Sequence, residues 1–205
     1  VAEGKMQEWA KMPSGWMRDK SALKLPKLTW TGDHRADQIA ALMIYIVLVQ
    51  HAQDQSSPGS KLEIGEVALT YTDLADKTGL SRAKVSGGLK VLTQMAVITE
   101  VSTGRNNRYQ VVGYNPVNGW AKLPARDLYG VGGGIRAFKD FKLRSKNELN
   151  ALKLYLVIAA FRDNSTNHCL MKYETFEFYT GVPRNEVRSA LSLLANCALV
   201  QIQAG

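Results

Sequence analysis

Hydrophobic residues recur at helical spacing in six stretches of the chain, and each recurrence predicts a helix with one buried face. In the first stretch, Ile39, Leu42 and Ile46 fall on one side of such a helix. Thr72 and Ser81 are typical capping residues and delimit the starts of two shorter helices. The expected helices are residues 36–53, 72–78, 82–95, 147–161, 173–179 and 184–196.

Between the helices, short runs of β-branched or alternating apolar residues predict strands. The runs at 97–101 and 108–112 flank a loop rich in turn-forming residues, which predicts a hairpin. In the second half of the chain only residues 169–171 and 199–203 fit a strand, so the second hairpin is either missing or lies beyond this fragment. The expected strands are residues 67–70, 97–101, 108–112, 169–171 and 199–203.

Residues 78–98 and 180–200 repeat one another at a single offset of 102 residues. Tyr45 and Tyr155 match at an offset of 110, so the repeat includes the long helix that precedes each segment. The repeat predicts a duplicated unit, comparable to a dimer fused into one polypeptide. The matching pairs are Thr78/Thr180, Gly79/Gly181, Leu80/Val182, Arg82/Arg184, Val85/Val187, Leu89/Leu191, Leu92/Leu194, Ala96/Ala198, Val97/Leu199 and Ile98/Val200.

The sequences that lead into the two copies also share a pattern. Gly15-Trp16 followed by Leu25-Pro26 resembles Gly119-Trp120 followed by Leu123-Pro124. Residues 130–134 read Gly-Val-Gly-Gly-Gly and predict a flexible joint. We therefore expect four parts, which are a basic lead-in (1–35), a first domain (36–114), a basic Gly-containing linker (115–146) and a second domain (147–205).

The chain of 205 residues carries a formal net charge of +8. Both halves contribute, with +3 in residues 1–112 and +5 in residues 113–205. A basic surface favours an anionic partner, either nucleic acid or an anionic lipid surface, although many proteins are mildly basic without a specific reason. The net charge alone therefore favours a nucleic-acid partner only slightly.

The longest apolar run, residues 39–49, is too short to span a bilayer, so we expect no membrane partner. Cys169 and Cys197 fit no metal-ligand spacing and are interpreted as reduced thiols, which favours a cytoplasmic location. His34, His51 and His168 are scattered, and no phosphate-binding glycine motif is present. We expect neither an enzyme nor a cofactor or metal.

The helix at 82–95 has the composition of a DNA-reading helix. Its core side carries the apolar positions of the repeat, and its opposite side carries small and basic residues that approach bases or phosphates. Two adjacent mid-helix glycines, Gly87 and Gly88, cost helix stability, which indicates close approach to either a phosphodiester backbone or another helix. The candidate DNA contacts here are Ser81, Arg82, Lys84, Ser86, Gly87 and Lys90.

Three further segments supply candidate contacts. The hairpin loop pairs turn formers with two arginines, which suit a groove or a phosphate, or else form a solvated turn. The linker before the second copy is basic, and the second copy's last helix exposes Arg and Asn beside the acidic Glu186. That copy either reads DNA or has a structural or self-association role. The candidates are Arg105, Asn107, Arg108, Lys142, Arg144, Arg184, Asn185 and Arg188.

The stretch from Tyr71 through Leu92, with its Thr-Gly-Leu-Ser turn, resembles the helix-turn-helix of winged-helix regulators and of plasmid and phage replication proteins. The resemblance implies a mainly α fold with small β-wings (α+β), built as two tandem winged helix-turn-helix domains related by the repeat. It also implies binding of double-stranded DNA through helix three of each domain, for transcription regulation or for replication and maintenance of a mobile element such as a plasmid. A homodimer and a replication or transcription partner stay open, and the alternative function is a winged-helix scaffold for protein assembly.

Overall fold

The computed structural model describes residues 6–102 and 107–203, which form a mixed α and β structure with small antiparallel sheets. The α+β class is therefore confirmed. The helices are α1 (Gly15–Arg18), α2 (Arg35–His51), α3 (Tyr71–Thr78), α4 (Arg82–Gln94), α5 (Lys146–Phe161), α6 (Tyr173–Thr180) and α7 (Arg184–Asn196), with 3-10 turns η1 (Leu25–Lys27), η2 (Arg126–Leu128) and η3 (Arg136–Asp140). The strands are β1 (Trp9–Pro13), β2 (Glu66–Ala68), β3 (Ile98–Ser102), β4 (Arg108–Val111) and β5 (Trp120–Pro124).

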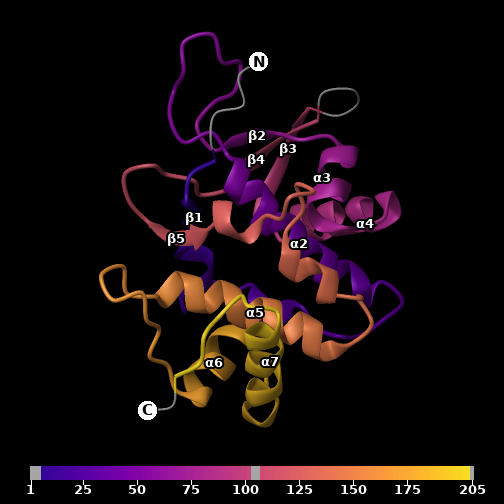
Figure 1. Cartoon of the computed structure of the whole chain (residues 1–205), viewed down its shortest axis with the longest axis vertical. Helices are drawn as coiled ribbons and strands as arrows, with labels where there is room; N and C mark the ends of the chain where they lie inside the picture. The colour runs from indigo at the N-terminus through magenta and orange to yellow at the C-terminus, as the bar shows by residue number, and fades with distance from the viewer. Residues whose placement is uncertain (1–5, 103–106, 204–205) are drawn as a thin grey trace.

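All six helices expected from the periodicity are present, with ends shifted by two residues at most. Two expected strands are wrong, because residues 169–171 and 199–203 belong to no strand or sheet in the described part of the chain. We call residues 35–111 (α2 to β4) the first unit and residues 146–203 (α5 onward) the second unit. Figure 1 shows the first unit in the upper part of the molecule and the second unit below it, with α2 and α5 between them.

Local capping explains where the helices of the first unit begin and end. Thr70, rather than the expected Thr72, caps α3 through a capping box in which its hydroxyl accepts from the Asp73 amide (3.1 Å) and its amide donates to the Asp73 carboxylate (2.7 Å). Gly79 ends α3 with φ of 75°, a left-handed conformation that glycine adopts without strain. Ser81 then caps α4 as expected, since its hydroxyl accepts from the Lys84 amide (3.3 Å).

The first unit carries a three-stranded antiparallel sheet in the order β2-β4-β3. The last strand in sequence, β4, therefore lies in the middle, and both edges of the sheet depend on it. Tyr109 and Val111 of β4 are buried, whereas Arg108 and Gln110 are partly exposed, which is the alternation of a strand with one buried face.

The lead-in and the linker are not accessory segments, because each supplies one strand of a second sheet. β1 and β5 pair antiparallel, with Trp9 opposite Pro124, Lys11 opposite Lys122 and Pro13 opposite Trp120. The two strands read Trp-Ala-Lys-Met-Pro and Trp-Ala-Lys-Leu-Pro, so the structural match lies at an offset of 111. The match expected between Gly15-Trp16 and Gly119-Trp120 is therefore misplaced.

This pairing relates the two halves of the chain by an approximate two-fold axis near Lys11 and Lys122, because two matching strands meet in a symmetric antiparallel register. Equivalent contacts repeat across it. The rings of Trp9 and Trp120 stack with centroids 5.4 Å apart, the Lys122 ammonium lies 4.9 Å from the Trp9 ring, and the Lys11 ammonium lies 5.4 Å from the Trp120 ring.

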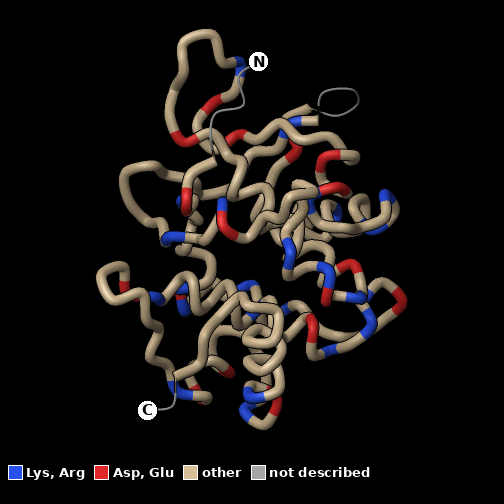
Figure 2. Tube along the Cα trace, viewed as in Figure 1, with Lys and Arg blue, Asp and Glu red and all other residues tan. Residues whose placement is uncertain are grey.

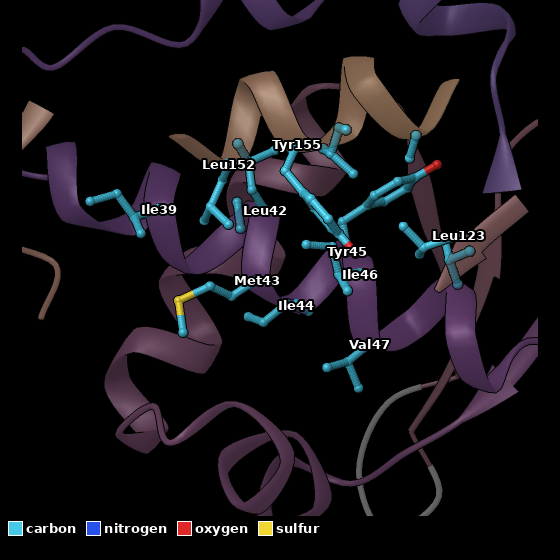
Figure 3. Packing of buried hydrophobic residues seen from close by; sticks show 14 of the residues in the cluster. Ile39, Leu42, Met43, Ile44, Tyr45, Ile46, Val47, Leu123, Leu152 and Tyr155 are labelled. Atoms are coloured by element: carbon cyan, nitrogen blue, oxygen red, sulfur yellow. The ribbon is translucent and has the colours of Figure 1, made fainter. Parts of the chain in front are cut away.

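The two long helices pack against one another close to this axis. Figure 3 shows Leu42 and Tyr45 of α2 beside Leu152 and Tyr155 of α5, and these residues match pairwise at the offset of 110. All four are buried in one hydrophobic cluster that contains residues of both units. Burial of this kind contributes about 25 cal/mol per Å² of apolar surface, so the units stabilise one another.

Each half of the chain also contacts the helix pair of the other. Pro26, in η1, lies against Gly181 at the end of α6, where an added Cβ would come within 3.0 Å of the Pro26 Cα. Reciprocally, Ile135 donates its amide to the Lys77 carbonyl at the end of α3 (2.9 Å). The Gly-rich segment expected to be a flexible joint is instead a turn closed by a bridge between Tyr129 and Ile135.

Candidate nucleic-acid interface

The turn between the last two helices of each unit has the same geometry in both copies. The Thr78 hydroxyl donates to the Leu74 carbonyl and the Thr180 hydroxyl to the Phe176 carbonyl, both at 2.6 Å. The following glycine has φ of 75° in the first unit and 70° in the second. The repeat in the sequence therefore corresponds to a repeated helix–turn–helix backbone, and its threonines and glycines are the residues that fix the turn.

The solvent-facing side of α4 presents Arg82, Ser86 and Lys90. The Arg82 guanidinium donates to the Thr72 hydroxyl (3.3 Å) and lies 6.0 Å from the Tyr71 ring, so α3 orients it. Ser86 and Lys90 are exposed, and the described residues offer their side chains no hydrogen-bond or ion-pair partner. These three side chains, with the capping Ser81 exposed at the start of α4, form an accessible polar row.

Lys84 does not belong to this row. Its ammonium lies 2.7 Å from the Asp37 carboxylate of α2, and both side chains are at least partly buried. His34 lies 3.4 Å from the other oxygen of the same carboxylate. Lys84 was expected to contact DNA, but its charge is already neutralised within the fold, so it acts as a link between α2 and α4.

Gly87 and Gly88 face α2, which corrects the expectation that Gly87 lies on the outer side of α4. A Cβ added to Gly87 would lie 2.5 Å from the Asp37 carboxyl carbon, and one added to Gly88 would lie 2.9 Å from the Ala41 backbone nitrogen. The two mid-helix glycines were expected to allow close approach either to a phosphodiester backbone or to another helix. The structure shows close approach to another helix, α2. Gly87 is removed from the candidate contacts for this reason.

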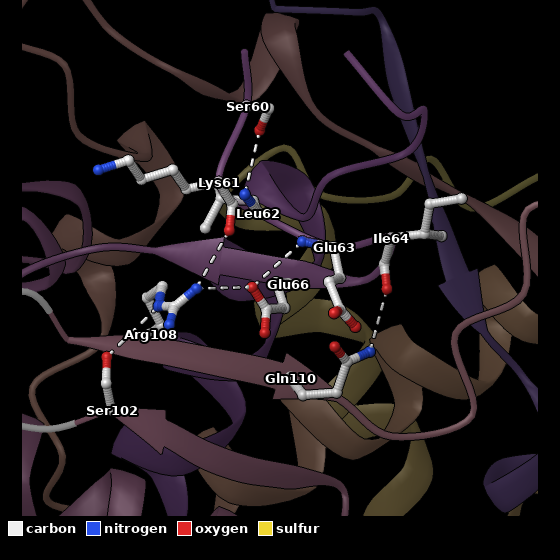
Figure 4. Close-up of polar contacts among 9 residues, drawn as sticks. All are labelled: Ser60, Lys61, Leu62, Glu63, Ile64, Glu66, Ser102, Arg108 and Gln110. Carbon is white, nitrogen blue, oxygen red and sulfur yellow. Dashed lines mark hydrogen bonds and ion pairs between the residues drawn. The ribbon is translucent and has the colours of Figure 1, made fainter. Parts of the chain in front are cut away.

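Arg108 was expected to contact DNA from the hairpin loop, and it instead links the strands at the base of the sheet (Figure 4). Its guanidinium lies 3.3 Å from the buried Glu66 carboxylate, donates to the Lys61 carbonyl (3.1 Å) and lies 3.5 Å from the Ser102 hydroxyl. Releasing it would leave the Glu66 carboxylate buried without its cation, which is costly. Asn107, beside it, is half-buried, and Arg105 lies outside the described residues.

The outer face of α7 differs from that of α4 in its charges. Arg184, the counterpart of Arg82, lies 3.3 Å from Glu174 and 3.1 Å from Glu177, both on α6. The Arg184 charge is therefore largely balanced, whereas Asn185 and Arg188 are exposed without such partners in the described residues. Glu186 faces α5, where it pairs with Lys146 and accepts from Asn150, both at 2.7 Å.

The basic linker residues Lys142 and Arg144 are exposed on a loop that Glu148 organises. The Glu148 carboxylate accepts the Arg144 amide (2.7 Å) and the Ser145 amide (2.8 Å), and also the Lys142 and Leu143 amides. Ser145 and Glu148 form a capping box at the start of α5, and the Ser-x-x-Glu spacing in the sequence is the signal for it. Glu148 thus positions the two candidate cations without contacting a ligand itself.

In the view of Figure 2, the basic residues near α4 do not stand apart from the acidic ones. Figure 2 shows Lys and Arg on α4 and along the segments between α4 and α5 at the right of the view, with Asp and Glu interleaved among them. Figure 1 places α4 in the upper part of the molecule and α7 in the lower part.

Comparison of the chain with protein-family models, with curated proteins and with solved structures finds no match. Within residues 6–102 and 107–203, no helix has the length and apolar character needed to cross a bilayer. The same residues bring together no group of three or more His, Cys, Asp or Glu side chains that could hold a metal ion.

Proposed function

We propose that the chain binds double-stranded DNA in a sequence-specific manner, with α4 as its principal reading helix and a tandem winged helix-turn-helix architecture. The single observation that carries the proposal is the repeated helix–turn–helix geometry combined with the accessible row of Ser81, Arg82, Ser86 and Lys90 on α4. In a helix-turn-helix motif, the second helix reads the major groove through its exposed side chains. Its Arg and Lys residues supply contacts to guanine and phosphate.

The order of elements in the first unit supports the winged-helix part of the proposal. Helix α2, strand β2, the α3–α4 pair and the β3–β4 hairpin follow one another as in a winged helix. The basic loop residues Lys142 and Arg144 are the best placed linker cations, because they are exposed and held on an ordered loop. The biological role would be transcription regulation or replication and maintenance of a mobile element's DNA.

The first unit is a better candidate for the DNA reader than the second. On α7 the Arg184 charge is balanced by α6 and Glu186 faces α5, which leaves Arg188 as its one cation without an acidic partner in the described residues. On α4 neither Arg82 nor Lys90 has an acidic partner in the described residues. That difference also favours a second candidate function for α6 and α7, which is protein assembly. The second unit would then hold a partner while the first unit reads DNA.

The test is selection from a pool of random-sequence duplexes, followed by affinity measurements at several salt concentrations. We expect an enriched sequence motif and an affinity that falls steeply with salt, because phosphate contacts release counterions. Arg82→Ala and Lys90→Ala should each weaken binding by about tenfold, in line with the 1–3 kcal/mol of a good base contact. Lys84 is left unchanged because its removal would disturb the fold.

Lys172→Ala is the matched control, since it removes the same charge from an exposed position outside α4 and α7. It should leave sequence preference unchanged. Absence of duplex binding at low salt, or an equal loss in the Lys172→Ala variant, would contradict the proposal. Circular dichroism of each variant checks that the fold is retained.

A further inference from the structure

An arginine at the start of α2 is held over an aromatic ring. Arg35 is exposed, and its guanidinium lies 5.3 Å from the centre of the Trp30 ring. Trp30 is half-buried and packs against the hydrophobic core, so the fold fixes the position of the ring. An arginine held in this way loses little further freedom when it binds a ligand, and the N–H groups at the edge of its plane stay available.

The start of α2 lies directly against α4. The Asp37 carboxylate lies 2.7 Å from the Lys84 ammonium, and a Cβ added to Gly87 would lie 2.5 Å from the Asp37 carboxyl carbon. His34, whose side chain is 91% exposed, lies 3.4 Å from the other oxygen of that carboxylate. The residues just before Asp37 therefore reach the surface beside the first two turns of α4, where the accessible polar row begins.

The Arg35 charge is not neutralised within the described part of the chain, where no carboxylate forms an ion pair with it. Lys84 and Arg184, by contrast, have acidic partners. Arg82 resembles Arg35, because it lies 6.0 Å from the Tyr71 ring and has no acidic partner among the described residues. The first unit thus holds two such arginines over aromatic rings, one supported by α3 and one by the loop before α2.

The second unit has no equivalent of this arginine and its ring. The offset of 110 between α2 and α5 places Asp140 and Ser145 at the positions of Trp30 and Arg35. Ser145 caps α5 instead. A stabilising role common to both units does not explain the Arg35–Trp30 pair, because the second unit folds without it.

We propose that Arg35, positioned by Trp30, binds a phosphate of the DNA backbone at the edge of the major groove that α4 reads. The inference rests on the proposed function and extends it, since it assigns to the start of α2 the contact that fixes the register of α4 on the duplex. A guanidinium donates two parallel N–H bonds to phosphate oxygens, and backbone contacts of this kind orient a protein without reading sequence. Arg35 thus contributes affinity, and Arg82 contributes sequence preference.

Affinities for two duplexes separate these roles. One duplex carries the motif enriched by selection, and the other is a scrambled duplex of the same length and composition. Arg35→Ala should weaken binding to both by the same factor, about fivefold, and reduce the slope of log affinity against log salt by about 1, because one phosphate contact is lost. Arg82→Ala should weaken binding to the selected duplex more than to the scrambled one.

Arg18→Ala is the matched control for Arg35→Ala. Arg18 is also exposed, and its guanidinium lies 5.0 Å from the Phe161 ring, at the end of α5 in the second unit. The control therefore removes an arginine held over an aromatic ring outside the first unit. It should change neither the affinity for either duplex nor the salt dependence.

A scan of single phosphates identifies the contact. Replacing one phosphate of the selected duplex with a neutral methylphosphonate removes the charge that Arg35 binds. At one or two positions beside the motif, the replacement should weaken binding of the natural chain about fivefold and leave the affinity of Arg35→Ala unchanged. Phosphates that other side chains contact should affect both proteins equally.

Trp30 is a positioning residue, and its role appears in the same measurements. Trp30→Leu keeps an apolar side chain but removes the ring, so it should reproduce part of the loss caused by Arg35→Ala. The two losses should not add in the double variant, because both changes act through one contact. Trp30→Phe should recover most of the affinity. Circular dichroism checks that each variant is folded, and the phosphate scan with Arg35→Ala decides the inference even where Trp30→Leu is unstable.

Three outcomes would overturn the inference while the proposed function stands. Arg35→Ala could bind both duplexes as the natural chain does, while Arg82→Ala loses sequence preference. Every methylphosphonate could affect the natural chain and Arg35→Ala equally. The Arg35→Ala loss could be confined to the selected duplex, which would make Arg35 a base reader. Absence of duplex binding by the natural chain would instead contradict the proposed function itself, and the inference with it.

Discussion

Lys84 and Glu186 occupy equivalent positions in the first turns of α4 and α7, and they carry opposite charges. Each pairs at 2.7 Å with the first helix of its own unit, Lys84 with Asp37 and Glu186 with Lys146. The ion pair between the two helices therefore lies at the same place in both units, but the positions of the positive and negative residues are exchanged. Exchange of α4 and α7 between units would bring like charges together, so this reversal favours the correct pairing of helices within a duplicated chain.

The Lys84–Asp37 pair should contribute more to stability than the Lys146–Glu186 pair. The Asp37 side chain is 12% exposed, whereas Lys146 is 48% exposed and screened by water. Double-mutant cycles with Lys84→Met and Asp37→Asn, and with Lys146→Met and Glu186→Gln, isolate the two coupling free energies. In urea unfolding we expect about 1–2 kcal/mol for the first and about 0.5 kcal/mol or less for the second. Equal couplings would show that burial does not separate the two pairs.

Gly87→Ala and Gly88→Ala should both destabilise the chain, although alanine favours helices more than glycine does. The added methyl group at Gly87 meets the Asp37 side chain, and the one at Gly88 meets the backbone of α2. Overpacking of this kind costs about 1–3 kcal/mol. Gly132→Ala is the control, because nothing lies within 4 Å of its Cβ position.

The two glycines should differ in whether their cost can be relieved. Removing the Asp37 side chain with Asp37→Ala clears the space beside Gly87, so Gly87→Ala should cost less in that background, measured as the shift in urea midpoint. The same background should give Gly88→Ala no relief, since backbone atoms of Ala40 and Ala41 remain in place. Relief at both positions, or at neither, contradicts this account of the helix contact.

Deletion of the residues before Ser14 should destabilise the whole chain and not only its N-terminus. It removes β1, including the fully buried Met12 side chain, and leaves β5 without its partner. We expect a lower thermal midpoint for a single transition that includes both units. Trp9→Ala, which removes only the stack with Trp120, should cost less than the deletion, with about 0.5–1.5 kcal/mol from the aromatic pair itself. An unchanged thermal midpoint after the deletion would show that these residues are not needed for the stability of the two units.

The helices and the repeat can be predicted from the sequence, because both depend on the spacing of residues that are close together in the chain. The apolar period identifies α2, α4, α5 and α7, and the Thr-Gly pair identifies the turn in each unit. β1 was missed because its five residues become a strand only by pairing with β5, more than 100 residues away. The strands expected at 169–171 and 199–203 are wrong for a related reason, since β propensity alone does not form a sheet and no described strand pairs with these segments.

In the candidate site, too, local features could be predicted from the sequence and long-range contacts could not. Exposed positions such as Ser86, Lys90 and Arg188 follow from helical periodicity, because they lie opposite the core positions. The charge partners of Lys84, Arg108 and Arg184 do not, since these come from α2, β2 and α6. Composition identifies a cation, but only the tertiary contacts show whether its charge is already neutralised.

Lys153 should make the stability of the chain depend on alkaline pH. It is buried in α5 and donates to the Leu28 and Thr180 carbonyls, and no carboxylate of the described residues pairs with it. Burial, with Lys146 nearby, lowers the pKa of its ammonium group to about 8 from an ordinary value of 10.5. The unfolded chain therefore binds more protons between these values, and the free energy of unfolding should rise with pH across this window.

The comparison is with Lys153→Met, because α2 carries Met43 at the equivalent position. Below pH 8 the full cost of burying the ammonium is present in the natural chain, roughly 3 kcal/mol from the pKa difference, and the cost falls as pH rises through 8 towards 10.5. Urea unfolding from pH 7 to 10 should show the natural chain gaining stability relative to Lys153→Met. Other groups that titrate in this range cancel in the difference between the two curves. Parallel curves would mean that Lys153 keeps its ordinary pKa, because water reaches its ammonium group in the folded chain.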